Sequence, residues 1–162
     1  MTSLIALALI AHQEQPARQQ DKHRFIQDRA FQLDKLKQAE CKIGKHKFKL
    51  WVMDTDAKRM EGMMFVTAKD FKDDEGMIFV FPNEDFRRFW MRNTLVDLDI
   101  TYNDKDGKIN TVLTMTKLDE TTDYSSKGPA LTVIELRDGT AKKLGLEEGM
   151  TWEIPEWVVA KD

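Results

Sequence analysis

The chain has 162 residues, of which 41% are hydrophobic and 33% charged, with a formal net charge of -3. This length is sufficient for one domain with a sizeable core, and the composition is too hydrophobic for an intrinsically disordered chain. The slightly acidic balance gives no indication of a nucleic-acid partner, and no apolar run is long enough to span a bilayer. Because Cys41 is the only cysteine, an internal disulfide and a cysteine-based zinc site are excluded.

The first twenty residues resemble an export segment. Ser3–Ala11 (SLIALALIA) is apolar like the central region of a secretory signal, although no basic residue precedes it, and residues 12–20 are polar like a linker. We therefore expect residues 1–20 to be a signal followed by a linker, which predicts a location in the periplasm or cell envelope. The alternative is the N-terminal segment of a cytoplasmic protein.

Residues 21–38 form a weakly patterned N-terminal extension in which a short helix is the most that can be predicted. The pattern changes at Ala39, where two arms at residues 39–43 and 47–53 flank Gly44 and predict a β-hairpin. In the second arm, alternation places Phe48, Leu50 and Val52 on one face and Trp51 on the other.

A short helix is predicted next. Thr55 is suited to its N-cap, and Gly62 is suited to its end. A second capped turn is predicted at Thr67, which has Asp70 three residues later.

The apolar run between Gly76 and Pro82 predicts a strand that is buried on both faces. Four further elements follow it. We expect strands at residues 95–102, 108–115, 130–136 and 150–154. In the first two, Leu98, Ile100 and Tyr102 should share one face, and Ile109, Leu113 and Met115 should point inward. A helical turn is expected at residues 139–144.

These short strands predict an all-β or β-rich α+β fold, a compact single-domain barrel or sandwich with short helices, over residues 39–159. The order of several motifs resembles the bacterial and archaeal family named domain of unknown function 192 (DUF192). The resemblance covers residues 39–154 and rests on Thr55, Arg59, residues 62–65, Asp74, residues 76–77, 79–81, 89–91, 93–94 and 98–100, Asp104, residues 106–107, Tyr124, Ser126, residues 129–130 and 135–136, Gly139, Gly145 and Gly149. It implies a compact β-rich domain, frequently exported or membrane-tethered, with no established activity.

The chain departs from the pattern of that family at a few positions. Asp97 and Lys117 stand where prolines are common, and Met150 stands where an aspartate is common. Many relatives carry a cysteine pair near residues 118–123, which this chain lacks. The first two departures should relax loops, and the missing pair removes any disulfide or thiol role there.

One group of side chains combines a stacking surface with hydrogen-bonding groups, as a ligand site would. We predict this candidate ligand-binding site at Arg59, Trp90, Asn93, Thr94, Asp99, Tyr124 and Ser126. An aromatic ring beside planar polar groups suits a sugar or a peptide. The alternative is a buried polar network that ties loops to the barrel with every group satisfied.

Four observations bear on catalysis and metals. Asp97 and Asp99 could serve as an acid–base pair in a hydrolase, although a solvated strand face explains them equally well. The three histidines lie outside the family-like blocks, so no serine–histidine–aspartate arrangement is indicated. The loop at Asp104 lacks an acid at the twelfth position of a calcium loop, where Met115 stands. Nine methionines could bind Cu(I) or simply fill the core.

The expectation from sequence is therefore a non-catalytic, exported envelope module that binds a small molecule or an envelope protein. No catalytic residue, metal site or cofactor is assigned, and the oligomeric state is left open. The alternatives are a hydrolase of envelope material that uses Asp99 and Asp97, and a methionine-based carrier of a soft metal.

Overall fold

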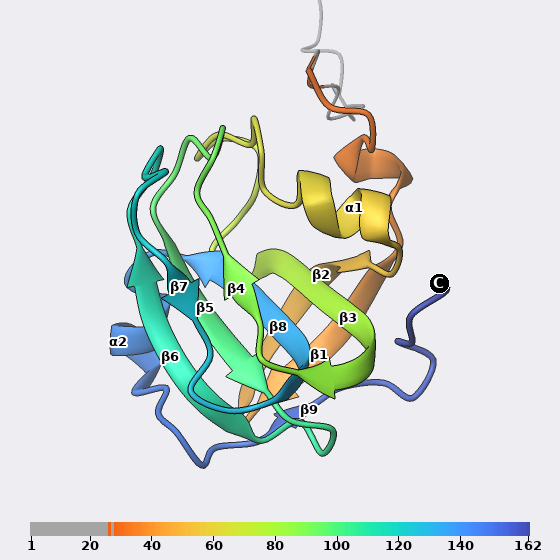
Figure 1. Ribbon diagram of the computed structural model, residues 1–162, viewed down its shortest axis with the longest axis vertical. Helices are drawn as coiled ribbons and strands as arrows, with labels where there is room; N and C mark the ends of the chain where they lie inside the picture. Colours follow the sequence, from red (N-terminus) through yellow and green to blue (C-terminus); the bar gives the residue numbers. More distant parts are fainter. Residues whose placement is uncertain (1–25, 27) are drawn as a thin grey trace, which may run out of the picture.

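The computed structural model describes residues 26 and 28–162, so the predicted signal, the linker and residues 21–25 and 27 lie outside the described part. The fold is a curled β-sheet with two short helices (Figure 1). Its elements are η1 (Leu33–Lys35), β1 (Gln38–Ile43), β2 (His46–Met53), α1 (Asp56–Glu61), β3 (Glu75–Asp85), β4 (Arg88–Phe89), β5 (Leu98–Asn103), β6 (Ile109–Met115), β7 (Tyr124–Ser125), β8 (Ala130–Arg137), α2 (Thr140–Leu144) and β9 (Trp152–Glu153).

The main sheet has seven strands in the order β6-β5-β8-β3-β2-β1-β9, and β4 pairs with β7 in a separate two-stranded sheet. The β2–β3 pair is parallel and is connected through α1, whereas the other pairs are antiparallel. The two edges of the main sheet approach each other at one end, where Lys108 forms a bridge with Thr151 and the Ile109 amide donates to the Met150 carbonyl at 2.8 Å. The predicted β-rich barrel with short helices is confirmed.

Each face of the main sheet carries its own hydrophobic cluster, because successive side chains of a strand point to opposite faces. On β3, Met77 and Phe79 join the first cluster, under α1, β4 and β7, while Ile78 and Val80 join the second, under α2 and β9. The prediction of a strand buried on both faces is therefore confirmed. The hairpin arm behaves in the same way, with Trp51 opposite Phe48, Leu50 and Val52.

The ends of α1 follow the sequence signals. The Thr55 hydroxyl accepts a hydrogen bond from the Lys58 amide at 3.4 Å, and Gly62 ends the helix with a φ of 46°. The buried guanidinium of Arg29 donates from Nη1 to the carbonyls of Gly62 and Met64 at 2.8 and 2.6 Å, which satisfies carbonyl groups at and beyond the end of the helix. The N-terminal extension thus packs on α1. The helix in its described part is only η1, a single 3-10 turn.

Two strand predictions needed correction. β5 begins at Leu98 rather than at residue 95, because the preceding segment bonds to a loop instead of a strand: the Leu118 amide donates to the Thr94 carbonyl at 3.0 Å. Asp97 Oδ1 accepts a hydrogen bond from the Lys117 amide at 2.7 Å. These two residues, which stand where the family commonly has prolines, therefore contact each other in this protein. The last strand is limited to β9, two residues long.

The third correction concerns Ile109. It lies in the second cluster, whereas Met115 lies in the first, and Leu113 packs against the first. The cause is a register shift: Tyr102 pairs with Thr111, but Asn103 pairs with Ile109. This bulge adds one residue to β6 and reverses the face of every side chain before it.

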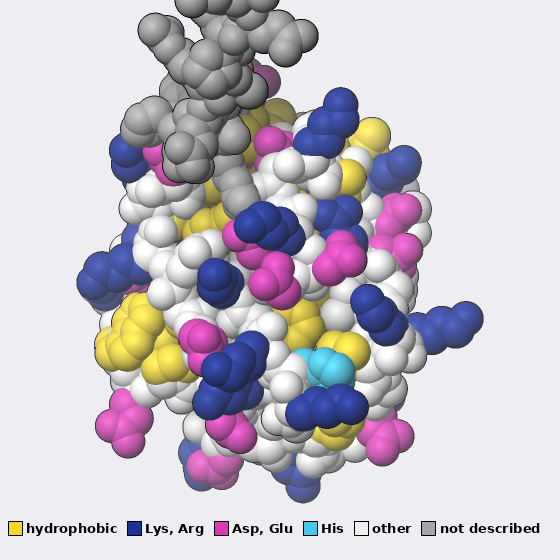
Figure 2. All heavy atoms as spheres, turned by 180° about the vertical axis from the view of Figure 1, so that it is seen from behind, with side chains coloured by type: hydrophobic (Ala, Val, Ile, Leu, Met, Phe, Trp, Pro, Cys, Tyr) yellow, Lys and Arg dark blue, Asp and Glu magenta, His cyan; other side chains and the backbone are white. Residues whose placement is uncertain are grey.

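Charged side chains are mixed on the side of the molecule opposite to the view of Figure 1. Lysines and arginines alternate there with aspartates and glutamates, and no large area carries a single sign (Figure 2). No helix in the described part of the chain has the length and apolarity that crossing a membrane requires.

Candidate functional site

A cleft with a volume of about 510 Å³ opens between α1, β4 and the loop that precedes β7. Its apolar lining comes from Met60, Phe81, Phe89 and Trp90. Its polar lining comes from Asp56, Arg59, Arg88, Glu120, Thr121, Thr122 and Asp123. This volume is in the range of pockets that hold small ligands.

Trp90 owes its position to the short strand β4. Alternation along the strand leaves Arg88 exposed and turns Phe89 inward, where its ring packs edge-on against Phe79 with centroids 4.9 Å apart and against Tyr102 at 5.9 Å. The next residue, Trp90, lines the cleft and keeps 49% of its surface exposed. A large aromatic side chain that is held at its base and open to solvent provides a stacking surface.

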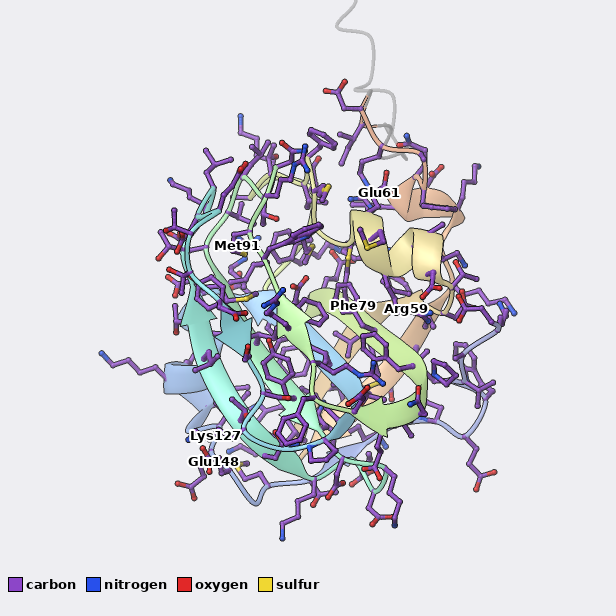
Figure 3. The ribbon with its side chains drawn as sticks, in the orientation of Figure 1. Arg59, Glu61, Phe79, Met91, Lys127 and Glu148 are labelled. Carbon is purple, nitrogen blue, oxygen red and sulfur yellow. The ribbon has the colours of Figure 1, made fainter. Side chains whose placement is uncertain are left out.

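Arg59 forms one wall of the cleft and is strongly constrained. Its Nη1 donates to the Val80 carbonyl at 2.7 Å, and its Nη2 donates to Asp56 Oδ1 at 2.5 Å and to Asp162 Oδ1 at 2.7 Å. The guanidinium also lies 5.1 Å from the centroid of the Phe81 ring. Burial opposes its charge, but the hydrogen bonds that it donates to Asp162 and Asp56 outweigh burial and raise the pKa of Arg59. In Figure 3, Arg59 and Phe79 lie below α1, beside β3.

Asn93 and Thr94 shape the connector that follows Trp90. Asn93 has a φ of 54° and its carbonyl accepts from the Phe65 amide at 2.9 Å, while its side-chain amide lies 3.9 Å from the Met64 sulfur. Thr94 is buried, and its hydroxyl lies 3.4 Å from the Arg92 carbonyl. Both residues hold the backbone that carries Trp90, and only Thr94 reaches a pocket.

Tyr124 and Ser126 fasten the loop on the other side of the cleft. The Tyr124 hydroxyl accepts from the Thr116 amide at 3.0 Å and donates to Asp119 Oδ2 at 3.0 Å. The Ser126 hydroxyl accepts from the Arg87 amide at 2.9 Å. Both side chains are buried and neither lines the cleft, so they belong to the polar network that ties the loop to the sheet.

Asp99 lies on the opposite face of the sheet from the cleft. It is only 2% exposed, and its Oδ1 accepts from the Thr114 hydroxyl and its Oδ2 from the Ala141 amide, both at 2.7 Å. Asp97 is tied to the loop amide of Lys117 and does not lie beside Asp99 on a strand face. Of the predicted group, Arg59 and Trp90 share the cleft, whereas Asn93, Thr94, Asp99, Tyr124 and Ser126 do not line it.

A residue outside the predicted set, Glu135, lines a pocket that adjoins the cleft. This second, narrow pocket shares Arg59, Met60, Phe89 and Trp90 with the cleft. The side chain is 4% exposed, and its Oε2 has no hydrogen-bond partner in the described part of the chain. Burial without a compensating cation raises the pKa of Glu135 to about 8.

One feature of the sequence indicates that Glu135 is unusual. The flanking residues Ile134 and Leu136 belong to the second cluster, so alternation turns Glu135 to the opposite face, between Met77 on β3 and Ile100 on β5. An acid in the interior of an apolar strand is a rare and costly placement. In the sequence, Glu135 also belongs to the family-like motif at residues 135–136.

The charges around the cleft are largely paired. Arg59 is shared by Asp56 and Asp162, and Arg88 lies 3.2 Å from Asp123. Both arginines that line the cleft are therefore paired with carboxylates. Over residues 26 and 28–162, no cluster of three or more histidine, cysteine, aspartate or glutamate side chains is arranged to hold a metal ion.

A family model covers residues 39–154 of the chain, which is most of its length, and includes the cleft-lining residues from Asp56 to Asp123. The chain belongs to the DUF192 family. That family is described as an "Uncharacterized ACR", so membership assigns a fold lineage and no activity to this DUF192 protein. No curated protein matches it.

Two solved structures resemble this DUF192 domain. One is a protein of unknown function from Novosphingobium aromaticivorans DSM 12444, with 33% identity and a TM-score of 0.65, covering 72% of this chain and 83% of the other. The second was solved as a "putative transcription regulator" from Sinorhizobium meliloti 1021, with 26% identity and a TM-score of 0.68, covering 74% of this chain and 95% of the other.

Proposed function

We propose that this DUF192 protein is a non-catalytic module that binds a small ligand in the cleft around Trp90. The observation that carries the proposal is the half-exposed Trp90, which follows the inward-packed Phe89 and lines the cleft together with Phe81 and Met60. Isolated surface aromatics need no explanation, but an aromatic in a cleft with several polar groups matches the composition of ligand sites.

The lining also limits the class of ligand. Its arginines are already paired with carboxylates, and Thr121, Thr122 and Glu120 add hydroxyl and carboxylate oxygens along the rim. A ligand with an apolar face and several hydrogen-bonding groups, such as a saccharide or a short peptide, complements this surface better than an anion does. An envelope protein that inserts one side chain into the cleft would use the same groups.

Hydrolysis is the weaker candidate, because the two carboxylates suggested for it are committed elsewhere. Asp99 caps the start of α2 from the far face of the sheet, and Asp97 holds Lys117. A methionine-based metal site is also weak, since Met63 and Met91 are part of the first hydrophobic cluster.

The proposal is tested by screening saccharides and short peptides by thermal shift and then measuring the affinity of every hit. The test variant is Trp90→Ala, and the control is Trp157→Ala, which removes an equally exposed tryptophan (50% against 49%) outside the cleft. Loss of binding in Trp90→Ala with retention in Trp157→Ala supports the proposal. Equal binding by both variants contradicts it.

Export to the cell envelope is proposed with it. It is supported by the apolar segment at Ser3–Ala11 and the polar residues that follow. Fractionation of cells that express the full chain, with N-terminal sequencing of the product, tests it. Uncleaved protein confined to the cytoplasm would contradict it.

A further inference from the structure

The narrow pocket that adjoins the cleft has features that the binding proposal does not use. Its volume is about 20 Å³, enough for one water-sized group, since a site for a single water needs roughly 10–15 Å³. Its lining includes the aromatic residues Phe79, Phe89 and Trp90 and the charged residues Arg59, Glu61, Arg92 and Glu135. Glu135 is the charged residue of this lining that is buried with an unpartnered oxygen.

A buried carboxyl group without a partner is costly, and the cost is removed by a hydrogen-bonding cation. Within residues 26 and 28–162, no charged side chain is bonded to Glu135 Oε2. Arg59 donates to Val80, Asp56 and Asp162, and Arg92, which also lines the pocket, is exposed. A ligand that enters the pocket would supply the partner that Glu135 lacks.

We propose that this pocket is an amine subsite, in which Glu135 receives a primary ammonium group of the ligand bound in the cleft. An ammonium group is close to water in size and donates three hydrogen bonds, which fits a pocket of this volume. The surrounding aromatic rings attract a cation through their faces, and tryptophan does so most strongly. This inference rests on the cleft being a ligand site and narrows the ligand to one that bears a primary amine.

The protonation step can be written in full. At neutral pH most Glu135 carboxyl groups hold a proton, since the pKa is about 8. Binding of the ammonium group forms a carboxylate–ammonium pair and releases that proton to solvent. No other atom is transferred and no bond other than the O–H bond is broken.

The other charged groups that line the pocket are Arg59 and Glu61 from α1 and Arg92 from the connector, and Tyr102 on β5 feels the charge of Glu135. Glu61 accepts from the amides of Ala30 and Phe31 at 2.6 and 3.0 Å and pairs with Arg29 at 3.2 Å. The pKa of Tyr102 is raised by burial and further by Glu135, so its phenol stays protonated between pH 6 and 8.

The test compares n-butylammonium with n-butanol, which has the same chain without the charge, by NMR titration of the Trp90 indole signal at pH 6, 7 and 8. An alkylammonium stays charged throughout, as lysine does. If only ionised Glu135 binds it, the affinity should rise about ninefold from pH 6 to 7 and about fivefold from pH 7 to 8. The affinity for butanol should not rise.

Two variants of the full chain sharpen the result. Glu135→Gln keeps the shape of the side chain and should abolish the preference for the amine. Glu120→Gln removes a carboxylate from the cleft rim and should leave the pH dependence unchanged. If Glu135→Gln does not fold, the pH dependence of butylammonium affinity in the wild-type protein still tests the amine subsite.

Two further probes distinguish the sources of the amine. A terminally blocked lysine and glucosamine, each compared with its acetylated amine, separate a peptide from a saccharide ligand.

Equal binding of amine and alcohol at Trp90 would overturn the amine subsite and leave the cleft proposal standing. Amine affinity that falls with rising pH would overturn it too, because Glu135 would then act as a neutral donor or merely hold a water. No response at Trp90 to any probe, together with an empty ligand screen, would overturn both proposals.

Discussion

The carboxylate of Asp99 and the backbone amide of Ala141 lie 2.7 Å apart, Oδ2 to nitrogen, and this contact joins β5 to the first turn of α2. The N-cap of α2 is Gly139, which has no side chain to bond the free amides of that turn. Asp99 supplies the missing acceptor from a strand that lies about forty residues earlier in sequence. Asp99 therefore has a structural role: it links β5 to the N-terminus of α2.

Asp99→Ala should therefore lower stability without affecting ligand binding. It leaves the Ala141 amide and the Thr114 hydroxyl without their acceptor, which should cost about 2–3 kcal/mol of unfolding free energy. Asp99→Asn retains an acceptor and should cost less. Urea denaturation measures both, with the exposed Asp106→Ala as a control expected within about 0.5 kcal/mol of wild type. A ligand affinity that falls in Asp99→Asn would argue against a purely structural role.

Phe79→Ala should destabilise the protein by about 3–5 kcal/mol, because it removes a fully buried ring from the first cluster and from contact with Phe89. Phe86→Ala provides the matched control. Phe86 is 65% exposed, so its replacement should hardly change the unfolding free energy. Chemical denaturation measures both. A cost below about 1 kcal/mol for Phe79→Ala would mean that β3 is not central to the core.

Glu135 should make stability fall as pH rises. Its pKa is raised from 4.5 to about 8 in the folded protein, so between these values the unfolded chain has lost a proton that the folded protein keeps. The folded state then binds more protons, and the stabilisation present below pH 4.5 is lost as pH increases to 8. The slope approaches about 1.4 kcal/mol per pH unit.

Denaturation of wild type and Glu135→Gln at pH 5, 6, 7 and 8 isolates this contribution, because all other groups titrate alike in both proteins. The difference in unfolding free energy should shift progressively in favour of Glu135→Gln as pH rises. A constant difference would show that Glu135 ionises normally in the folded protein.

The fold was largely predictable because its strands carry unambiguous alternation. Leu50, Val52, Ile78 and Val80 reach one cluster and their neighbours reach the other, as a period of two requires. Ile109 was assigned to the wrong face because a bulge depends on the pairing of two strands, which no single strand encodes.

The site was harder to predict, because its geometry is set by long-range pairing. Arg59 and Trp90 lie 31 positions apart and meet only after β4 pairs with β7 under α1. Asp99 seemed close to Asn93 in sequence, but the pleat of β5 turns it to the opposite face. Glu135 acquires its isolation from Met77 and Ile100 on both neighbouring strands, and its own strand shows only that it interrupts an apolar run.

The central claim, that the cleft around Trp90 is a ligand site, is tested most directly by mapping amide and indole NMR shifts as the hits of a ligand screen are added. We predict that the shifts concentrate on Met60, Phe89, Trp90 and Thr121 and saturate with a single affinity, which Trp90→Ala abolishes and Trp157→Ala preserves. Shifts that gather on another surface, or a screen of saccharides, peptides and amines that moves none of these signals, would contradict the account.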